Sequence, residues 1–149
     1  FGRRQDPEGQ YAAVIPKFVE SILQFESPAV FGDGEQSRDF TYIDNVIQMN
    51  LNALSTISSQ AFGEVFNVAC GSRITINELF FSIRDLLSKY DKSLNTVEAT
   101  HIGERAGDIR HSLADISKAQ SHLNYIPTHD CQQGLEEAMN WYWNSLRGD

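Results

Sequence analysis

Two glycine-containing stretches carry the residues best suited to bind an anionic ligand. They are residues 32–40, with the sequence GDGEQSRDF, and residues 105–112, with the sequence RAGDIRHS. Each places an arginine among glycines, and the guanidinium group is a planar, permanently charged fork that can bind phosphate oxygens in pairs. The rest of the chain is strongly acidic. Two such loops therefore predict a diphosphate that is held from two sides.

The first loop has the residue order of a β-hairpin. A strand ending at Phe31 would be followed by a tight turn at Gly32-Asp33-Gly34 and a return strand through Arg38. Arg38 would then stand beside the turn, within reach of a ligand phosphate. The same residues also fit a surface hairpin in which Arg38 only pairs with Asp39 or Asp33. The residues alone leave both interpretations open.

The second loop combines a cation with a carboxylate. Arg105 and Asp108 lie three residues apart around Gly107. Asp108 is suited to accept hydrogen bonds from ribose hydroxyls while Arg105 binds phosphate. The alternative is a solvated loop with an internal ion pair, which contributes less than ~1 kcal/mol at an exposed position.

Other reactive residue types do not form a chemical site in the sequence. The histidines include no pair four residues apart, so no metal site is predicted. Cys70 is interpreted as a small buried side chain, and with Cys131 it makes neither metal-type spacing nor a disulfide framework, which favours a cytoplasmic setting. No Gly-x-Gly-x-x-Gly and no Tyr-x-x-x-Lys occurs, so the chain is not expected to bind a dinucleotide by the usual glycine-rich turn.

Charge and length exclude several classes of function. The 149 residues include 12 Lys and Arg against 20 Asp and Glu, a net charge of −8. Nonspecific binding to nucleic acids or to anionic membranes requires a cationic face, so neither partner is expected. No apolar run approaches the ~18 residues of a membrane span. The length fits one domain, residues 1–149, with no internal boundary.

Hydrophobic periodicity predicts an α-helix-rich α/β domain with short strands and long polar loops. A capping box at Thr75 and Glu78 marks the start of one helix, and Asp44, Asp115 and Asp130 are expected to cap three others. The predicted helices are 12–25, 45–58, 75–90, 115–123 and 130–146. The predicted extended segments are 29–31, 40–43, 65–68 and 96–102, of which 65–68 is expected to be a central strand.

Taken in order, several motifs resemble a known family. They are FGRRQDP at 1–7, YAAVIP at 11–16, the two arginine loops, YIDN at 42–45, NVACG at 67–71 and LADISKA at 113–119. This set resembles the C-terminal substrate domain of the NAD-dependent epimerase/dehydratase family of extended short-chain dehydrogenases/reductases, and is most similar to bacterial UDP-N-acetylglucosamine (UDP-GlcNAc) 4-epimerases. The resemblance covers essentially the whole chain. With the absence of an initiator Met, it implies a fragment that lacks the Rossmann half of a two-domain enzyme.

The resemblance implies a UDP-sugar site. Arg38 and Arg105 match the two arginines that bind the diphosphate, and Asp108 matches the carboxylate on the ribose. Ser112 stands where relatives restricted to non-acetylated sugars carry a bulky tyrosine, which favours an N-acetylated sugar. The residues matching uridine contacts are Ala13, Val14, Phe18, Val30, Phe31 and Gly32, of which Phe18 fits a plain core position equally well.

The resemblance also implies a division of labour. NAD and a Tyr–Lys pair would belong to the absent N-terminal domain, so this chain is expected to hold no cofactor and no catalytic residue, and to be inactive alone. The parent enzyme is expected to be a homodimer. The alternatives are the substrate domain of a UDP-glucose 4-epimerase, a decarboxylase or a 4,6-dehydratase, a nucleotide-sugar binding module without catalysis, and a plain interaction domain.

Overall fold

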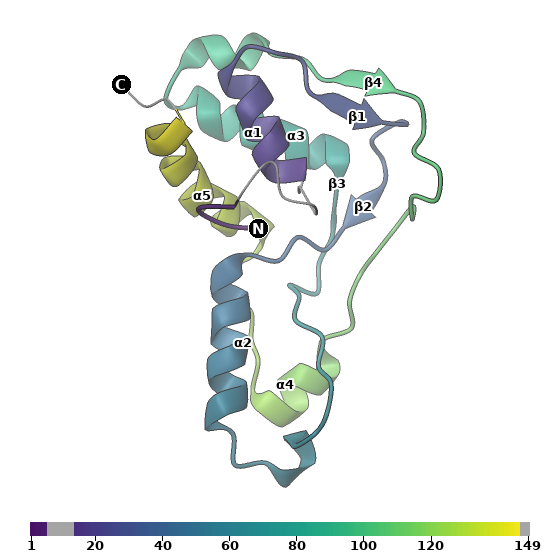
Figure 1. Cartoon of the computed structure of the whole chain (residues 1–149), viewed down its shortest axis with the longest axis vertical. Helices are drawn as coiled ribbons and strands as arrows, with labels where there is room; N and C mark the ends of the chain where they lie inside the picture. Colours follow the sequence, from purple (N-terminus) through teal and green to yellow (C-terminus); the bar gives the residue numbers. More distant parts are fainter. Residues whose placement is uncertain (6–13, 147–149) are drawn as a thin grey trace.

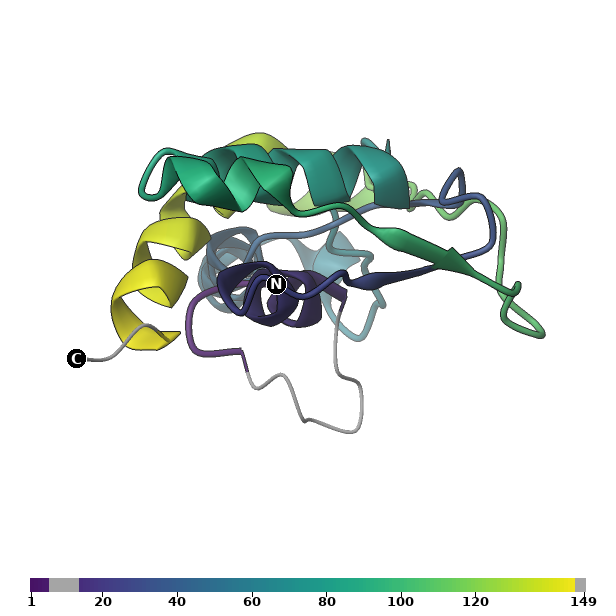
Figure 2. The same ribbon diagram turned by 90° about the horizontal axis from the view of Figure 1, so that it is seen from above.

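The computed structural model describes residues 1–5 and 14–146, and the statements below concern those residues. Three helices surround the larger hydrophobic core: α1 (Val14–Leu23), α3 (Ile76–Ser88) and α5 (Cys131–Leu146) (Figure 1). The buried residues of α1 include Ile15, Phe18, Val19 and Ile22, whose spacing of three and four places them on one helical face. In Figure 2, α1 and α3 form two packed layers, from which two strands extend together.

Two helix starts follow from side-chain capping, as the sequence predicts. The Oγ1 of Thr75 accepts a hydrogen bond from the Glu78 amide at 3.1 Å, and the Glu78 carboxylate accepts one from the Thr75 amide at 2.7 Å. At α5, Oδ1 of Asp130 accepts a hydrogen bond from the Gln133 amide at 2.8 Å. Each bond satisfies a backbone donor that has no partner within its own helix.

The strands are short and form two separate pairs. Strand β1 (Ala29–Phe31) runs parallel to β4 (Thr100–Ile102), and β2 (Ser37–Arg38) runs antiparallel to β3 (Ile74–Thr75). Two 3₁₀ helices, η1 (Ser59–Ala61) and η2 (Lys92–Thr96), lie in the connections. Within residues 1–5 and 14–146, neither pair is extended into a larger sheet. The predicted helix-rich α/β class with short strands is confirmed.

A second, smaller hydrophobic cluster lies below the first in Figure 1, between α2 (Ile43–Ser55) and α4 (Ser117–Leu123). The buried Tyr125 hydroxyl donates to the Ala69 carbonyl at 2.8 Å, which fixes the segment after η1 against this cluster. Asn45, fully buried, accepts hydrogen bonds from the Thr128 and His129 amides at 2.9 and 3.1 Å. Its side chain thereby joins α2 to the segment that leads into α5.

Five sequence predictions about local structure are wrong. One is the cap of α4, where Ile116 and not Asp115 is the N-cap, although Oδ1 of Asp115 accepts a hydrogen bond from the Ser117 amide at 2.8 Å. The loop after Phe31 does not form a hairpin, because β1 pairs with β4 and β2 pairs with β3. Helix α2 begins at Ile43 with Tyr42 as N-cap, so Asp44 lies in its first turn and does not cap it.

Residues 65–68 form no strand, because no backbone–backbone hydrogen bond within the described residues involves them. Residues 40–43 form none either, because their bonds to a neighbouring backbone end at one residue, Phe1, whose amino group donates to the Thr41 carbonyl at 2.7 Å and whose carbonyl accepts from the Ile43 amide at 2.8 Å.

None of the helices in the described residues is long and apolar enough to cross a membrane.

Candidate functional site

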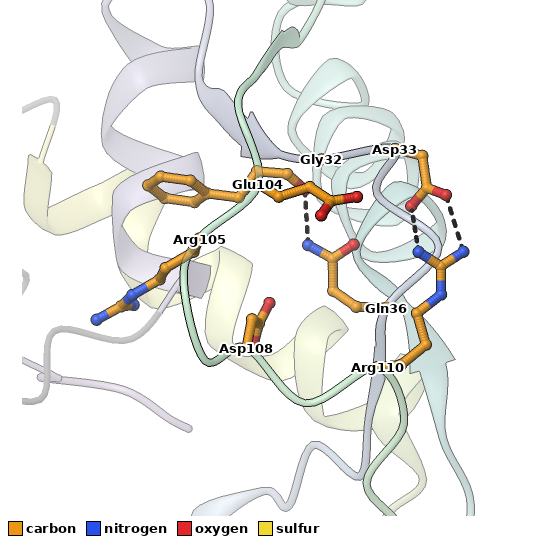
Figure 3. A pocket seen from close by; sticks show the side chains of 8 residues that line it. Gly32, Asp33, Gln36, Glu104, Arg105, Asp108 and Arg110 are labelled. Atoms are coloured by element: carbon orange, nitrogen blue, oxygen red, sulfur yellow. Dashed lines mark hydrogen bonds and ion pairs between the residues drawn. The ribbon is translucent and has the colours of Figure 1, made fainter.

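The two arginine loops meet at a pocket of about 140 Å³. Figure 3 shows that the labelled residues come from the turn after β1 and from the segment after β4. The pocket is lined by Phe31, Gly32, Asp33, Gln36, Glu104, Arg105, Asp108 and Arg110.

The parallel pairing of β1 with β4 brings the loops together. The pairing places Phe31 beside Ile102, and the Gly32 amide then donates to the Ile102 carbonyl at 2.9 Å. Nδ1 of His101 lies 2.9 Å from the Gly32 carbonyl oxygen. Both strands therefore end at the same edge, and the loop that follows each strand starts beside the other.

Ser37 fastens the second loop to β2. Its amide donates to the Arg110 carbonyl at 2.9 Å, and its carbonyl accepts from the Ser112 amide at 3.0 Å. The Oγ of Ser37 lies 2.9 Å from Nδ1 of His111. The opposite edge of Ser37 pairs with Thr75 of β3. This buried serine thus holds residues 110–112 in register with the first loop.

Two ion pairs cross between the loops. Arg38 pairs with Asp108 through Nη2, with both side chains about one third exposed or less. Arg110 binds Asp33 with two hydrogen bonds, Nη1 to Oδ1 at 3.0 Å and Nη2 to Oδ2 at 2.8 Å. The Arg110 guanidinium, followed by the Glu35 amide, holds the pKa of the Asp33 carboxyl below its ordinary value. The site is therefore held by charge as well as by backbone hydrogen bonds.

Arg105 differs from the other two arginines. In Figure 3 its side chain extends away from the Asp33–Arg110 pair, and it is exposed. Within the part of the chain that the structure describes, no carboxylate lies within ion-pair distance of its guanidinium. Arg105 is therefore available to an anionic ligand at the pocket rim.

The turn of the first loop requires glycine at one position. Gly34 has φ +74°, and a Cβ added there would lie 2.0 Å from Oδ1 of Asn77. Asn77 in turn donates through Nδ2 to the Asp33 carbonyl at 2.9 Å and to the Glu35 carboxylate at 2.8 Å. The start of α3 thus packs directly against the turn and sets the position of Asp33.

Known proteins resemble this chain in sequence and in fold. A sequence profile of the NAD dependent epimerase/dehydratase family matches residues 1–69. A UDP-N-acetylglucosamine 4-epimerase from Methanobrevibacter ruminantium, solved in complex with UDP-N-acetylmuramic acid, superimposes with a TM-score of 0.82 at 41% identity over 96% of this chain. This chain belongs to the epimerase/dehydratase family.

Two further members of the epimerase/dehydratase family resemble nearly the whole chain. A putative UDP-glucose 4-epimerase from Methanocaldococcus jannaschii is 35% identical over 147 residues, 99% of this chain. The UDP-glucose 4-epimerase of Thermotoga maritima, solved with UDP-glucose, has a TM-score of 0.83 at 35% identity over 98% of it. The chain spans 43–44% of the length of these three relatives.

The predicted site residues fall into three groups. Phe31, Gly32, Arg105 and Asp108 line the pocket, and Arg38 reaches it through Asp108. Ser112 is exposed beside β2 and does not line the pocket. The others lie in or against the larger core, namely Val14, Phe18 and Val30. Ala13 lies outside the described residues. Phe18 is 2% exposed and packs edge-to-face on Phe80 with ring centroids 5.9 Å apart, so its contact with uracil stays a prediction.

Four lining residues were not predicted as site residues: Asp33, Gln36, Glu104 and Arg110. Gln36 is 8% exposed, and its Nε2 donates to the Phe31 carbonyl at 2.8 Å, which closes one wall. Asp33, Gln36 and Arg110 all stand within the two loops quoted from the sequence. A buried glutamine and a reciprocal Asp–Arg pair are visible only once the loops are placed side by side.

A cluster of potential metal ligands lies away from the pocket. The ligand atoms of Asp44, His129 and Glu137 lie within 4.8 Å of one another. Nε2 of His129 is 3.0 Å from Glu137, Tyr42 donates to the same carboxylate at 3.1 Å, and Arg3 lies 3.7 Å from Asp44. The His129 hydrogen bond and then that of Tyr42 lower the pKa of Glu137. These contacts already engage all three groups, so no metal is assigned.

The described residues do not fit the dinucleotide that the family name implies. In a Rossmann unit, the pyrophosphate of the dinucleotide is bound by a glycine-rich turn between a strand and a helix whose first amides are free. Gly32 and Gly34 lead into β2, which is a strand. The first amides of α3 already have partners, because Ile76 donates to the Gln36 carbonyl, Asn77 to the Gly34 carbonyl and Glu78 to Oγ1 of Thr75. These residues therefore form no cradle for the pyrophosphate of NAD.

Proposed function

We propose that this chain binds the uridine diphosphate part of a nucleotide sugar, as the C-terminal substrate domain of a UDP-GlcNAc/UDP-GalNAc 4-epimerase. The observation that carries the proposal is the pocket between the two loops. The Arg105 guanidinium lies at its rim without a carboxylate partner among the described residues, and Arg38 is ion-paired with Asp108, which lines the pocket. The protein is strongly acidic overall, so the arginines at this pocket provide a local positive charge. Such a charge is suited to bind a diphosphate.

In this proposal, three charged side chains of the site each have a defined role in binding the ligand. Arg105 meets the diphosphate directly. Arg38 turns from Asp108 toward the phosphate oxygens or shares its remaining N–H groups with them, and Asp108 accepts hydrogen bonds from the ribose hydroxyls. The chain binds and orients its substrate, while proton and hydride transfer belong to groups outside it. In this scheme the isolated chain is inactive, NAD is bound elsewhere in the enzyme, and the enzyme is a cytoplasmic homodimer.

The small side chain of Ser112 is an argument for an N-acetylated sugar as the substrate. Its amide is anchored to the Ser37 carbonyl at 3.0 Å, so its position relative to the loops is fixed. A serine side chain leaves room that a tyrosine would fill. The 41% identity to a UDP-N-acetylglucosamine 4-epimerase supports the same choice, whereas the two similar UDP-glucose 4-epimerases support the plain sugar. Substrate domains of a decarboxylase or a 4,6-dehydratase, and a binding module without catalysis, are the other candidates.

Calorimetric titration of the chain with UDP, UDP-glucose and UDP-GlcNAc tests the binding step. UDP is expected to bind, and Arg105→Ala is expected to weaken it by about 1.5–3 kcal/mol, the usual contribution of a hydrogen bond to a charged group. That loss corresponds to roughly 10–150-fold in Kd. Lys17→Ala, an exposed cation on α1, is the matched control and leaves UDP affinity unchanged. No binding of UDP, or equal binding by Arg105→Ala, contradicts the proposal.

Turnover separates the sugar candidates. The complete enzyme that contains this chain is expected to interconvert UDP-GlcNAc and UDP-GalNAc faster than UDP-glucose and UDP-galactose. Equal rates for both pairs refute the argument from Ser112. Release of carbon dioxide from a UDP-uronic acid would identify a decarboxylase instead.

A further inference from the structure

Carboxylates compete for the arginines of the pocket between the two loops. The lining includes two cations and three carboxylates: Arg105, Arg110, Asp33, Glu104 and Asp108. A third cation, Arg38, is ion-paired with Asp108 and does not line the pocket. A diphosphate in this pocket is therefore bound by the guanidinium N–H groups that face it and that no carboxylate already uses.

Arg110 has such N–H groups. Its side chain is 55% exposed, against 27% for Arg38. Nη1 and Nη2 of Arg110 each donate one hydrogen bond to the Asp33 carboxylate, at 3.0 and 2.8 Å. A guanidinium group has five N–H groups, so three remain beyond this pair. The Asp33 pair therefore orients Arg110 and still leaves it able to bind an anion.

Both partners of this ion pair are fixed through the backbone. Oδ1 of Asp33 accepts from the Glu35 amide at 2.9 Å, and the Asp33 carbonyl accepts from Nδ2 of Asn77, also at 2.9 Å. On the second loop, the Arg110 carbonyl accepts from the Ser37 amide at 2.9 Å. Helix α3 thus holds one end of the pair and strand β2 the other. A cation that is already in place loses little conformational freedom when a ligand binds.

The two lining arginines face the pocket from different directions. Figure 3 shows the guanidinium groups of Arg105 and Arg110 at opposite sides of the labelled residues, with Asp108 and Gln36 between them in this view. Among the described residues, Arg105 has no carboxylate within ion-pair distance, whereas Arg110 is oriented by one. An anion in the pocket therefore meets one cation without an ionic partner and one whose direction is set by Asp33.

We propose that Arg110 binds the diphosphate together with Arg105, and that Asp33 is the positioning residue that directs the Arg110 guanidinium. The inference rests on the proposed function, in which this pocket binds UDP. It adds a residue to that proposal, where Arg38, Arg105 and Asp108 are the charged groups that meet the ligand. The oxygens of the diphosphate accept from the N–H groups that Asp33 leaves unused.

Calorimetric titration with UDP tests the role of Arg110. Arg110→Ala is expected to raise the Kd at least about tenfold, the usual effect of losing a hydrogen bond to a charged group. Arg110→Lys keeps the charge but lacks the planar fork, so it is also expected to bind UDP more weakly than the wild type. Lys118→Ala is the matched control and leaves the Kd unchanged. It removes one positive charge and one exposed ion pair, with Glu64 at 2.7 Å, outside the pocket lining.

Two carboxylate variants test the positioning role of Asp33. Glu104→Gln and Asp33→Asn each remove one negative charge from the pocket lining, which by itself strengthens the binding of an anion. Glu104 forms no ion pair within the described part of the chain, so Glu104→Gln is expected to lower the Kd of UDP. Asp33→Asn is expected to raise it, because the Arg110 guanidinium loses its charged partner. In an Arg110→Ala background, Asp33→Asn is expected to lower the Kd as Glu104→Gln does.

The outcomes separate this inference from the proposed function. If the wild type binds UDP and Arg105→Ala weakens it, an unchanged Kd in Arg110→Ala overturns the inference alone. No binding of UDP by the wild type overturns both. Wild-type affinity in Arg110→Lys, or a lower Kd in Asp33→Asn with Arg110 present, overturns the positioning role of Asp33. Circular dichroism checks the fold of each variant, and Arg110→Gln replaces Arg110→Ala if the latter does not fold.

Discussion

The Arg38 guanidinium donates to the Asp108 carboxylate across 70 residues of sequence. The first residue was predicted to bind phosphate and the second to bind ribose, yet in the free protein each is the partner of the other. Arg38 also donates through Nη1 to the Ser37 carbonyl at 2.8 Å. The ion pair therefore sets the orientation of both groups, and any ligand that binds either side chain must compete with it.

Asp108→Asn separates the two roles of this carboxylate. Because the ion pair is partly exposed, its loss is expected to lower the free energy of unfolding by less than about 1 kcal/mol. If Asp108 accepts from the ribose, wild-type protein prefers UDP to 2′-deoxy-UDP, and the variant loses this preference. Chemical denaturation and calorimetry measure the two effects. An unchanged preference in Asp108→Asn refutes the ribose contact.

Three glycine substitutions distinguish backbone strain from a steric clash. Gly34→Ala combines φ +74° with a Cβ 2.0 Å from Oδ1 of Asn77. It is expected to destabilise by about 2–4 kcal/mol, because the loop loses the Asn77 hydrogen bonds as well. Gly63→Ala has φ +74° but open space, so about 1–2 kcal/mol is expected.

Gly103→Ala is the control for this series. It has neither a positive φ nor a neighbour within 4 Å, so its effect is expected to stay within about 0.5 kcal/mol. Urea unfolding of the three variants measures the order. Equal losses at Gly34 and Gly63 would show that Asn77 moves aside without cost.

The Asp33–Arg110 pair makes part of the stability depend on pH. The pKa of Asp33 is lowered in the folded protein, first by the Arg110 hydrogen bonds. The contribution of this ion pair to the free energy of unfolding is therefore complete above pH 3.8, the ordinary pKa of the Asp33 carboxyl. It disappears as the pH falls through the lower pKa that Asp33 has in the folded protein. Arg110→Gln is expected to raise the Asp33 pKa towards 3.8 in an NMR titration and to flatten acid destabilisation in that window. An unshifted titration contradicts the pair.

The two cysteines are expected to differ in reactivity. Burial raises the pKa of the Cys131 thiol to about 12, while Cys70, half-buried, has a pKa raised first by burial and then by Asp39. Since the thiolate is the reactive form, iodoacetamide at about pH 8 modifies Cys70 first and Cys131 only after unfolding. Mass spectrometry of the intact protein over time measures the order. Faster labelling of Cys131 in the folded protein would contradict its burial.

Local signals in the sequence predicted most of the helices. The Thr75–Glu78 capping box and the Asp130 cap act over three residues, and the apolar spacing of α1 acts over one helical turn. These interactions form within a single segment, so they can be read without knowledge of its neighbours. The ordered motifs likewise indicated the epimerase/dehydratase family, and the comparisons confirm it.

Pairing between distant segments was decided by the tertiary structure. The sequence indicated a hairpin at residues 32–40, but β1 found its partner in β4, 71 residues further along by register from Ala29 to Thr100. The same pairing produced the Arg38–Asp108 and Asp33–Arg110 ion pairs. Strand propensity at 65–68 was visible in the sequence, yet a strand requires a second backbone to bond with. By itself the sequence determined which residues carry charge and which segments are helical; contacts between segments decided which charges meet and which strand has no partner.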